Sequence, residues 1–239
     1  MCTSIVINQK KTLVGFNFDN PGWKCHLVTK NKAFYISLLV GKLWEPCFGC
    51  NSRGDVVNLP AMNPGVKEGY YQAGPSLHYI DKINLDLLLE RISFSELVQL
   101  VQQNPIYNEK HHSLQAQDSD KEGNVLQIFP GLGYKILAKP AYSVMTNFQL
   151  MKEEKDHHPW AGVDRYDKAN ALLKAAKTDF SVNDLFVLLK AVAQEEGGAP
   201  TAVSFVYDIE AKTVYYCENR HFENIQTLCF EQMGHHEAK

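Results

Sequence analysis

The sequence predicts one α+β domain, residues 1–239, in which two antiparallel sheets are covered by helices. The expected elements follow one another as strands, two helices, strands, two helices and strands. Apolar residues make up 45% of the chain and charged residues 21%, a composition typical of a globular protein. We find no repeat, low-complexity segment or linker that would divide the chain, although the polar tail 234–239 is expected to fray.

The expected strands are short β-prone runs bounded by turn residues. Residues 3–8 and 12–18 are separated by three polar residues, which predicts a hairpin. A second hairpin is expected around the turn at 121–124. The further strands are expected at 33–41, 47–58, 112–118, 125–129, 134–145, 201–207 and 213–217.

Two helices are predicted in the first half of the chain. Asn84 is a candidate cap for a helix over 85–91. Ser93 and Glu96 form a capping box ahead of an amphipathic run, and Pro105 marks the end of that second helix.

Two further helices are predicted in the second half. Residues 164–177 have helical spacing of their apolar side chains. Ser181 and Asp184 form a second capping box, and the helix that they begin is expected to end at Gly197 and Gly198.

Charge and hydropathy argue against several classes of partner. The net charge is −3 and the basic residues are scattered, so we expect no nucleic acid. The chain has no apolar run of about 18 residues, so we expect no membrane span. Gln9, Lys10 and Lys11 interrupt the first apolar run, which argues against a secretory signal and favours a cytoplasmic protein. The charge and hydropathy of the sequence are compatible with a homo-oligomer.

The six cysteines do not suggest a disulfide framework, because a chain of this size can bury a core without one. Cys47 and Cys50 form a CxxC, which could be a redox pair or half of a zinc site. Since no second CxxC occurs, we interpret them as two thiols on a strand that leads into a turn. We expect no metal and no organic cofactor.

Cys2 is the residue most indicative of chemistry. The initiator methionine is normally removed before so small a residue, which would leave a thiol and an α-amine on Cys2. An amine with a pKa of about 7.7–8.0 can accept the thiol proton near neutral pH. One residue would then supply both the nucleophile and the general base.

The stretch MCTSIVINQKKTLVGFNFDN resembles the opening of the choloylglycine hydrolase family, which contains bile salt hydrolases and penicillin V acylases. Four later segments resemble further family motifs, in the family's order. They are Asn51-x-x-Gly54 with Met62-Asn63-Pro64, the hairpin HSLQAQDSDKEGNVLQI, Val144-Met145-Thr146-Asn147, and Asp164-Arg165-Tyr166 with Ala169.

The resemblance implies a four-layer αββα sandwich of the N-terminal-nucleophile hydrolases. It implies that Cys2 attacks the carbonyl of a linear amide and that Asp19 accepts a hydrogen bond from the Cys2 amine. Asn147 would donate to the developing oxyanion, with Asn63 as a second polar contributor, and Arg165 would be a buried cation that holds Cys2 and Asp19.

One position departs from the family pattern. Phe16 replaces an arginine of the family's Gly-Arg-Asn-x-Asp motif, and an aromatic ring does not favour a thiolate. The expected substrate is a small N-acyl amide, with an apolar acyl group seated in a pocket. The candidate pocket residues are Phe16, Phe18, Trp23, Met62, Tyr70 and Tyr71, although aromatic residues at such positions also pack in cores.

Two alternatives stay open at this point. The chain could be a weakened or inactive relative that binds its ligand without cleaving it, because of Phe16. It could also be a glutamine amidotransferase of the Cys2 type, although no stretch suggests a site for the glutamine α-amino acid.

Overall fold

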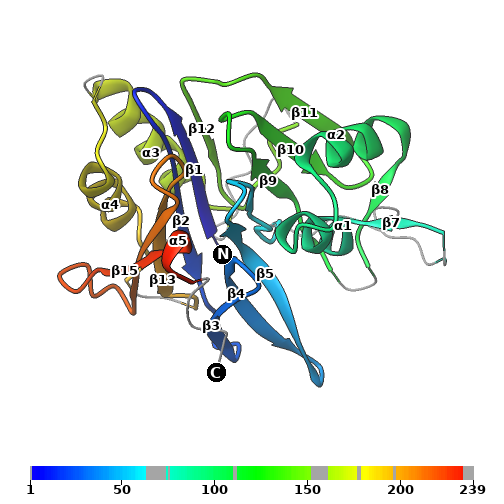
Figure 1. The fold of residues 1–239 in the computed structure, drawn as a ribbon, viewed down its shortest axis with the longest axis horizontal. Helices are drawn as coiled ribbons and strands as arrows, with labels where there is room; N and C mark the ends of the chain where they lie inside the picture. The colour runs from blue at the N-terminus through cyan, green and yellow to red at the C-terminus, as the bar shows by residue number, and fades with distance from the viewer. Residues whose placement is uncertain are drawn as a thin grey trace.

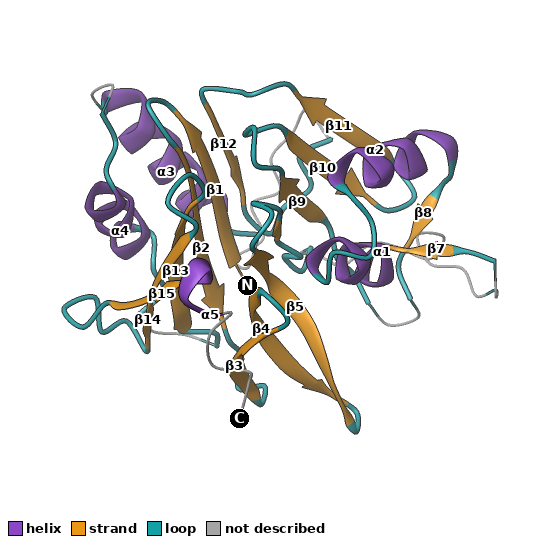
Figure 2. Cartoon of the chain, viewed as in Figure 1, coloured by secondary structure: helices purple, strands orange, loops and turns teal. Residues whose placement is uncertain are grey.

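The computed structural model describes residues 2–62, 74, 76–109, 112–151, 161–176, 179–195 and 198–233. Their backbone forms two large antiparallel sheets with helices on the outer faces (Figure 1). Figure 2 shows the same arrangement by type of element, with α3 and α4 on one side, α1 and α2 on the other, and the strands of the two large sheets between these pairs. The predicted fold class, a sandwich of two antiparallel sheets flanked by helices, is confirmed.

The first sheet has six strands in the order β12-β1-β2-β13-β14-β15. Its two central hairpin strands run antiparallel, with Cys2 opposite Phe18. The strands are β1 (Cys2–Asn8), β2 (Thr12–Asp19), β12 (Tyr142–Met145), β13 (Thr201–Asp208), β14 (Thr213–Glu218) and β15 (Gln226–Cys229).

The second sheet has seven strands in the order β11-β10-β9-β6-β5-β4-β3. The strands are β3 (Cys25–Lys30), β4 (Ala33–Val40), β5 (Leu43–Asn51), β6 (Val56–Val57), β9 (Ala116–Ser119), β10 (Val125–Phe129) and β11 (Gly133–Leu137). Two short strands, β7 (His78–Tyr79) and β8 (Ile106–Tyr107), pair in parallel outside it.

Helices cover the outer face of each sheet (Figure 1). Helix α4 (Val182–Ala191) packs on β2 and β13, and α3 (Val163–Ala175) packs on β12. Helix α1 (Ile80–Leu88) packs on β5 and β6, with α2 (Phe94–Gln103) beside it, and the short α5 (Phe230–Met233) follows β15. Within the described residues, none of these helices has the length and apolarity needed to cross a membrane.

Side-chain alternation along β1 and β2 divides the apolar residues between two cores. Ile5, Ile7 and Leu13 belong to the core beneath α3 and α4. Val6 and Phe16 belong to the core shared with the second sheet. Because both faces of these strands are covered, every residue of β2 is buried.

The two predicted capping boxes are confirmed, but one predicted cap is wrong. Asn84 lies inside α1, which begins at Ile80, and its Nδ2 donates to both carboxylate oxygens of Asp118 at 2.9 Å. Asn84 is therefore a buried link between α1 and β9. The helix that Ser181 caps ends at Ala191, before the two glycines that we expected to end it.

The single strand expected at 134–145 is also wrong, because this segment supplies two strands to different sheets. Strand β11 belongs to the second sheet and β12 to the first. Between them Lys139 has a φ of 40° and Pro140 has no amide hydrogen to donate, so the ladder cannot continue. Strands β3 and β15 were not predicted, since polar residues interrupt their short apolar patterns.

The turn between β9 and β10 is fastened to β1 of the other sheet. The Nδ2 atom of Asn8 donates to the carbonyls of Gly123 and Pro140, each at 2.8 Å. Gly123 has a φ of +83°, and a Cβ atom there would lie 1.9 Å from Oδ1 of Asn8. Only glycine fits this contact.

We therefore expect Gly123→Ala to destabilise the protein by about 1–3 kcal/mol, through backbone strain and loss of the Asn8 contact. Urea unfolding would measure the change. Gly41→Ala is the matched control, because Gly41 also has a positive φ (+62°) but a Cβ atom there would meet nothing within 4 Å. Equal losses for the two variants would show that the contact with Asn8 does not matter.

Candidate active site

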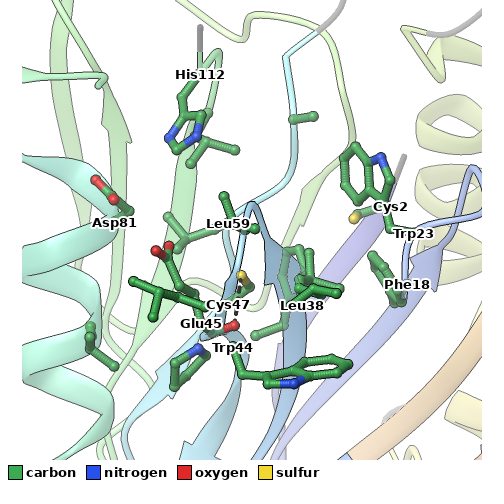
Figure 3. A pocket seen from close by; sticks show the side chains of 18 of the residues that line it. Cys2, Phe18, Trp23, Leu38, Trp44, Glu45, Cys47, Leu59, Asp81 and His112 are labelled. Carbon is green, nitrogen blue, oxygen red and sulfur yellow. Dashed lines mark hydrogen bonds between the residues drawn. The ribbon is translucent and has the colours of Figure 1, made fainter. Parts of the chain in front are cut away.

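A cavity of about 790 Å³ opens between the ends of the sheets and α1. It is lined by the first residue of β1, the end of β2, the β4–β5 hairpin, the start of α1 and residues 112–114. Figure 3 shows Cys2, Phe18 and Trp23 on one side, Asp81 and His112 on the other, and Cys47 between them. Most of the lining side chains are apolar.

The strand register directs the Cys2 thiol into this cavity. Cys2 pairs with Phe18, and residues directly opposite each other on neighbouring strands point to the same face. Both side chains line the cavity. Asp19 is the next residue of β2, so its side chain points to the other face of the sheet, toward α3. The two residues are therefore adjacent, with the thiol and the carboxylate on opposite faces.

Arg165 of α3 joins the four polar groups around Cys2. Its Nη1 atom donates to the carbonyl of Cys2 at 2.8 Å, to Oγ1 of Thr3 at 2.8 Å and to Oδ2 of Asp19 at 3.1 Å. Its Nη2 atom donates to Oδ1 of Asn147 at 2.9 Å. The side chain is only 6% exposed, and such charge-assisted hydrogen bonds are stronger than neutral ones. The structure thus brings Cys2, Asp19, Asn147 and Arg165 together.

The orientation of the Asn147 amide follows from its partners. Its Oδ1 atom accepts from the backbone nitrogen of Cys2 at 2.8 Å and from Arg165. Because both partners can only donate, this atom is the oxygen. Its Nδ2 atom donates to the carbonyl of Ala61 at 2.5 Å. From the family resemblance we expected Asp19 to accept the hydrogen bond from the amine of Cys2, whereas the nitrogen of Cys2 donates to Asn147.

The carboxylate of Asp19 is held by two further side chains. Thr201 donates to Oδ1 at 2.6 Å, and Nε2 of Gln194 donates to Oδ2 at 2.7 Å. Burial raises the pKa of the Asp19 carboxyl, while the charge of Arg165 and the hydrogen bond from Thr201 lower it. Sequence reasoning missed Thr201 and Gln194, because nothing in the sequence distinguishes them from other polar residues at the ends of elements.

Sequence reasoning also missed Gly162, which precedes the Asp-Arg-Tyr segment. Gly162 is the N-cap of α3 with a φ of 73°, in the left-handed region. A Cβ atom there would lie 2.3 Å from Nη2 of Arg165. Glycine therefore lets the guanidinium fold back over the start of its own helix toward Cys2.

The electrostatic surroundings of Cys2 oppose ionisation of the thiol. Burial is the main cause that raises the pKa of this thiol to about 11, and the charge of Asp19 acts in the same direction. The positive charge of the α-amino group, a hydrogen bond from the backbone N–H of Asp19 and the charge of Arg165 act in the opposite direction. The thiol is therefore protonated near neutral pH and needs a base to become a nucleophile.

Cys47 is a second thiol in the cavity. Phe48 pairs with Ile36 and Pro46 with Ser37, so Cys47 is the extra residue of a β-bulge. Burial, followed by the charges of Glu45 and Asp81, raises its pKa to about 12. Cys47 and its CxxC partner Cys50 both lie on β5, and all six cysteines have free thiols.

The other predicted site residues have different environments. Phe18, Trp23 and Met62 line the cavity. Phe16 lies in the core, fully buried, with its ring 5.0 Å from that of Phe48, and is not among the residues that line the cavity. The predicted residues Asn63, Tyr70 and Tyr71, like the tail 234–239, lie outside the described residues.

Comparisons with known proteins identify the fold. No protein-family model matches the chain, and no curated protein matches it in sequence. A conjugated bile acid hydrolase from Clostridium perfringens, solved as the mutant C2A, superposes with a TM-score of 0.69 at 15% identity, covering 97% of this chain and 93% of that one.

Two other solved structures have the same fold. The penicillin V acylase from Agrobacterium tumefaciens gives a TM-score of 0.69 at 14% identity, over 97% of this chain and 87% of that one. The N-acylethanolamine-hydrolyzing acid amidase ortholog from Caenorhabditis elegans gives a TM-score of 0.62 at 18% identity, over 87% of this chain and 93% of that one. The fold expected from the family resemblance is thereby confirmed.

We expect Arg165→Met to destabilise the protein by about 3–5 kcal/mol, because it leaves the buried Asp19 carboxylate without its cation. Arg91→Met is the matched control, since Arg91 forms an ion pair with Asp86 in which both side chains are substantially exposed. That substitution should cost less than about 1 kcal/mol. Chemical unfolding would compare them, and equal small losses would contradict a structural ion pair at Arg165.

Proposed function

We propose that this chain belongs to the choloylglycine hydrolase family and hydrolyses linear carbon–nitrogen amide bonds of small N-acyl compounds, with Cys2 as the nucleophile. One observation carries the proposal. The Cys2 thiol opens into a large apolar cavity, while Asn147 and Arg165 hold the nitrogen and carbonyl of the same residue. In addition, the clostridial hydrolase of the same fold was solved with its own second residue, a cysteine, replaced by alanine.

Removal of Met1 would convert the backbone nitrogen of Cys2 into an α-amine at the position where Asn147 now accepts its hydrogen bond. The neutral amine would take the thiol proton as the sulfur attacks the carbonyl carbon of the amide. The C–N bond then breaks, the amine product leaves with that proton, and the acyl group stays on sulfur as a thioester. Water hydrolyses the thioester and restores the thiol.

The polar groups around Cys2 have distinct parts in this proposal. The amide of Asn147 carries two N–H groups, and the bond to Ala61 uses one, so the other can donate to the oxyanion. A donor of this kind commonly contributes about 3–4 kcal/mol to the transition state. Arg165 fixes the Cys2 carbonyl and favours the thiolate, and Asp19 neutralises the charge of Arg165. The role of Asn63 stays a prediction.

The cavity supports an apolar acyl group. Phe18, Leu38 and Phe48 line it, and the half-exposed Trp23 and Trp44 offer further aromatic surface. A volume of about 790 Å³ falls in the range of ordinary small-molecule sites, about 300–1,000 Å³. We propose a phenoxyacyl amide, an N-acyl amino acid or an acyl lactone ahead of a bulky bile salt conjugate, as expected from the sequence.

A second candidate is a relative that binds such a ligand without cleaving it. Two observations favour this alternative: the high pKa of the Cys2 thiol, about 11, and the burial of Phe16 in the core, where it supplies no charge to the thiol. Turnover distinguishes the two candidates.

We expect the Met1-free protein to release the amine from members of a panel of N-acyl substrates. Cys2→Ala should lower the rate by at least about a thousandfold while leaving ligand binding intact, because only the attacking atom is lost. Cys47→Ser is the matched control, a second cavity thiol whose loss should leave the rate within the same order. Binding without amine release would favour the non-catalytic candidate, and ammonia from glutamine would indicate an amidotransferase.

We also expect the alkylation of Cys2 by iodoacetamide to depend on Met1. In protein that retains Met1, the rate should keep rising toward pH 11, because the thiolate fraction grows up to the thiol pKa of about 11. In Met1-free protein it should level off nearer the ordinary α-amine pKa, about 7.7–8.0, because the amine then accepts the thiol proton. Mass spectrometry of the Cys2 peptide would follow both reactions, and coinciding profiles would contradict the role of the amine.

A further inference from the structure

Asp81 and His112 lie across the cavity from Cys2 (Figure 3) and, together with Glu109, form a second group of polar side chains. Its members are Asp81, Glu109 and His112, which we call the Asp81 cluster. Asp81 lies in the first turn of α1, and the other two follow β8. One oxygen or nitrogen atom from each of the three side chains lies within 4.8 Å of the others. Asp81 and His112 also line the cavity.

Three atoms of this cluster are buried without a hydrogen bond. They are both carboxylate oxygens of Asp81 and Nδ1 of His112, and none of them forms a hydrogen bond within the part of the chain that the structure describes, although Oδ2 of Asp81 lies 3.5 Å from Nζ of Lys82. An unsatisfied buried polar group commonly costs about 1–3 kcal/mol, and more if it is charged. Carboxylate oxygens and imidazole nitrogens coordinate metal ions, so a bound cation would satisfy these atoms.

Lys82 compensates the negative charge of the cluster only in part. Its Nζ atom lies 3.5 Å from Asp81 and 3.7 Å from Glu109, and its side chain is half exposed. Two carboxylates share that one ammonium group. The surroundings therefore stay negative with Lys82 in place.

We propose that the Asp81 cluster binds a divalent transition-metal ion, with Zn²⁺ as the representative case. Imidazole nitrogen favours zinc and its neighbours in the periodic table over Mg²⁺ and Ca²⁺, and carboxylates complete many zinc sites. Three protein ligands leave a coordination position for water or a ligand, as in catalytic zinc sites. This proposal does not depend on the reaction proposed for Cys2.

The geometry requires only a small adjustment. Zinc ligands about 2.0–2.2 Å from the ion lie roughly 3.3–3.6 Å apart in a tetrahedral site. The ligand atoms of the cluster lie within 4.8 Å of one another, and the remaining adjustment is within reach of Glu109, whose side chain is 38% exposed. Since Asp81 and His112 line the cavity, the fourth position would face the space that also contains Cys2.

Zinc titration of the full chain, without a histidine tag and after chelator treatment, tests the proposal. Isothermal calorimetry near neutral pH should show one ion bound per chain. Asp81→Asn and His112→Gln should each weaken binding by at least about tenfold. Lys82→Met should tighten it, because the competing ammonium is removed. Lys82 is half exposed, so this variant is expected to fold even if a cluster variant does not.

Two controls separate the Asp81 cluster from other zinc ligands. His221→Gln removes an exposed histidine that contacts Glu223 at 2.9 Å, and it should leave affinity unchanged. Cys47→Ser removes a thiol that also lines the cavity, and it should also leave zinc affinity unchanged. The visible spectrum of the Co²⁺ form should show d–d bands without the near-ultraviolet band of a cobalt–thiolate bond.

Three results would overturn the proposal. They are unchanged zinc affinity in Asp81→Asn or in Lys82→Met, loss of binding in Cys47→Ser, and no zinc binding at all by the unaltered chain. Binding of an alkylammonium ion in the absence of zinc affinity would instead assign the cluster to the cationic group of an organic ligand.

Discussion

The candidate site depends on one buried ion pair. Arg165 extends from α3 to the adjacent ends of β1 and β2, where its guanidinium lies among the Cys2 carbonyl, Asp19 and the Asn147 amide oxygen. Burying a guanidinium and a carboxylate costs several kcal/mol in desolvation, which is recovered only when nearly every hydrogen bond is made. That demand accounts for the hydrogen bonds to Asp19 from Thr201 of β13 and from Gln194 in the preceding loop, and for the glycine at the start of α3. Three strands and a helix are thereby fixed around one residue.

The two faces of β1 and β2 separate positioning from the cavity. Alternation places the Cys2 thiol and Phe18 on the face toward the second sheet, and Thr3 and Asp19 on the face toward α3. Arg165 therefore holds the backbone of Cys2 without entering the apolar cavity. A ligand can fill that cavity without disturbing the ion pair, and the same apolar surroundings raise the pKa of the thiol.

Local signals could be predicted from the sequence, whereas long-range partners could not. The capping boxes at Ser93 and Ser181 depend on residues three apart, so both helix starts were correct. Asn84 has the same local signal as a cap, but Asp118, far along the chain, decides its position. Cys2, Asp19, Asn147 and Arg165 could be predicted as one site only from the family resemblance, because no local pattern links them. No local pattern joins Asp81 to Glu109 and His112, because the parallel pairing of β7 with β8 is what brings together the segments that follow these two strands.

The most direct test of the account is to find which atom carries the acyl group during turnover. Met1-free protein would be mixed with a slowly hydrolysed N-acyl substrate, quenched in acid, digested and mapped by mass spectrometry. The account predicts one acyl group on the sulfur of Cys2, in a peptide that begins with Cys2. An acyl group on Cys47, or turnover by protein in which every chain retains Met1, would contradict it.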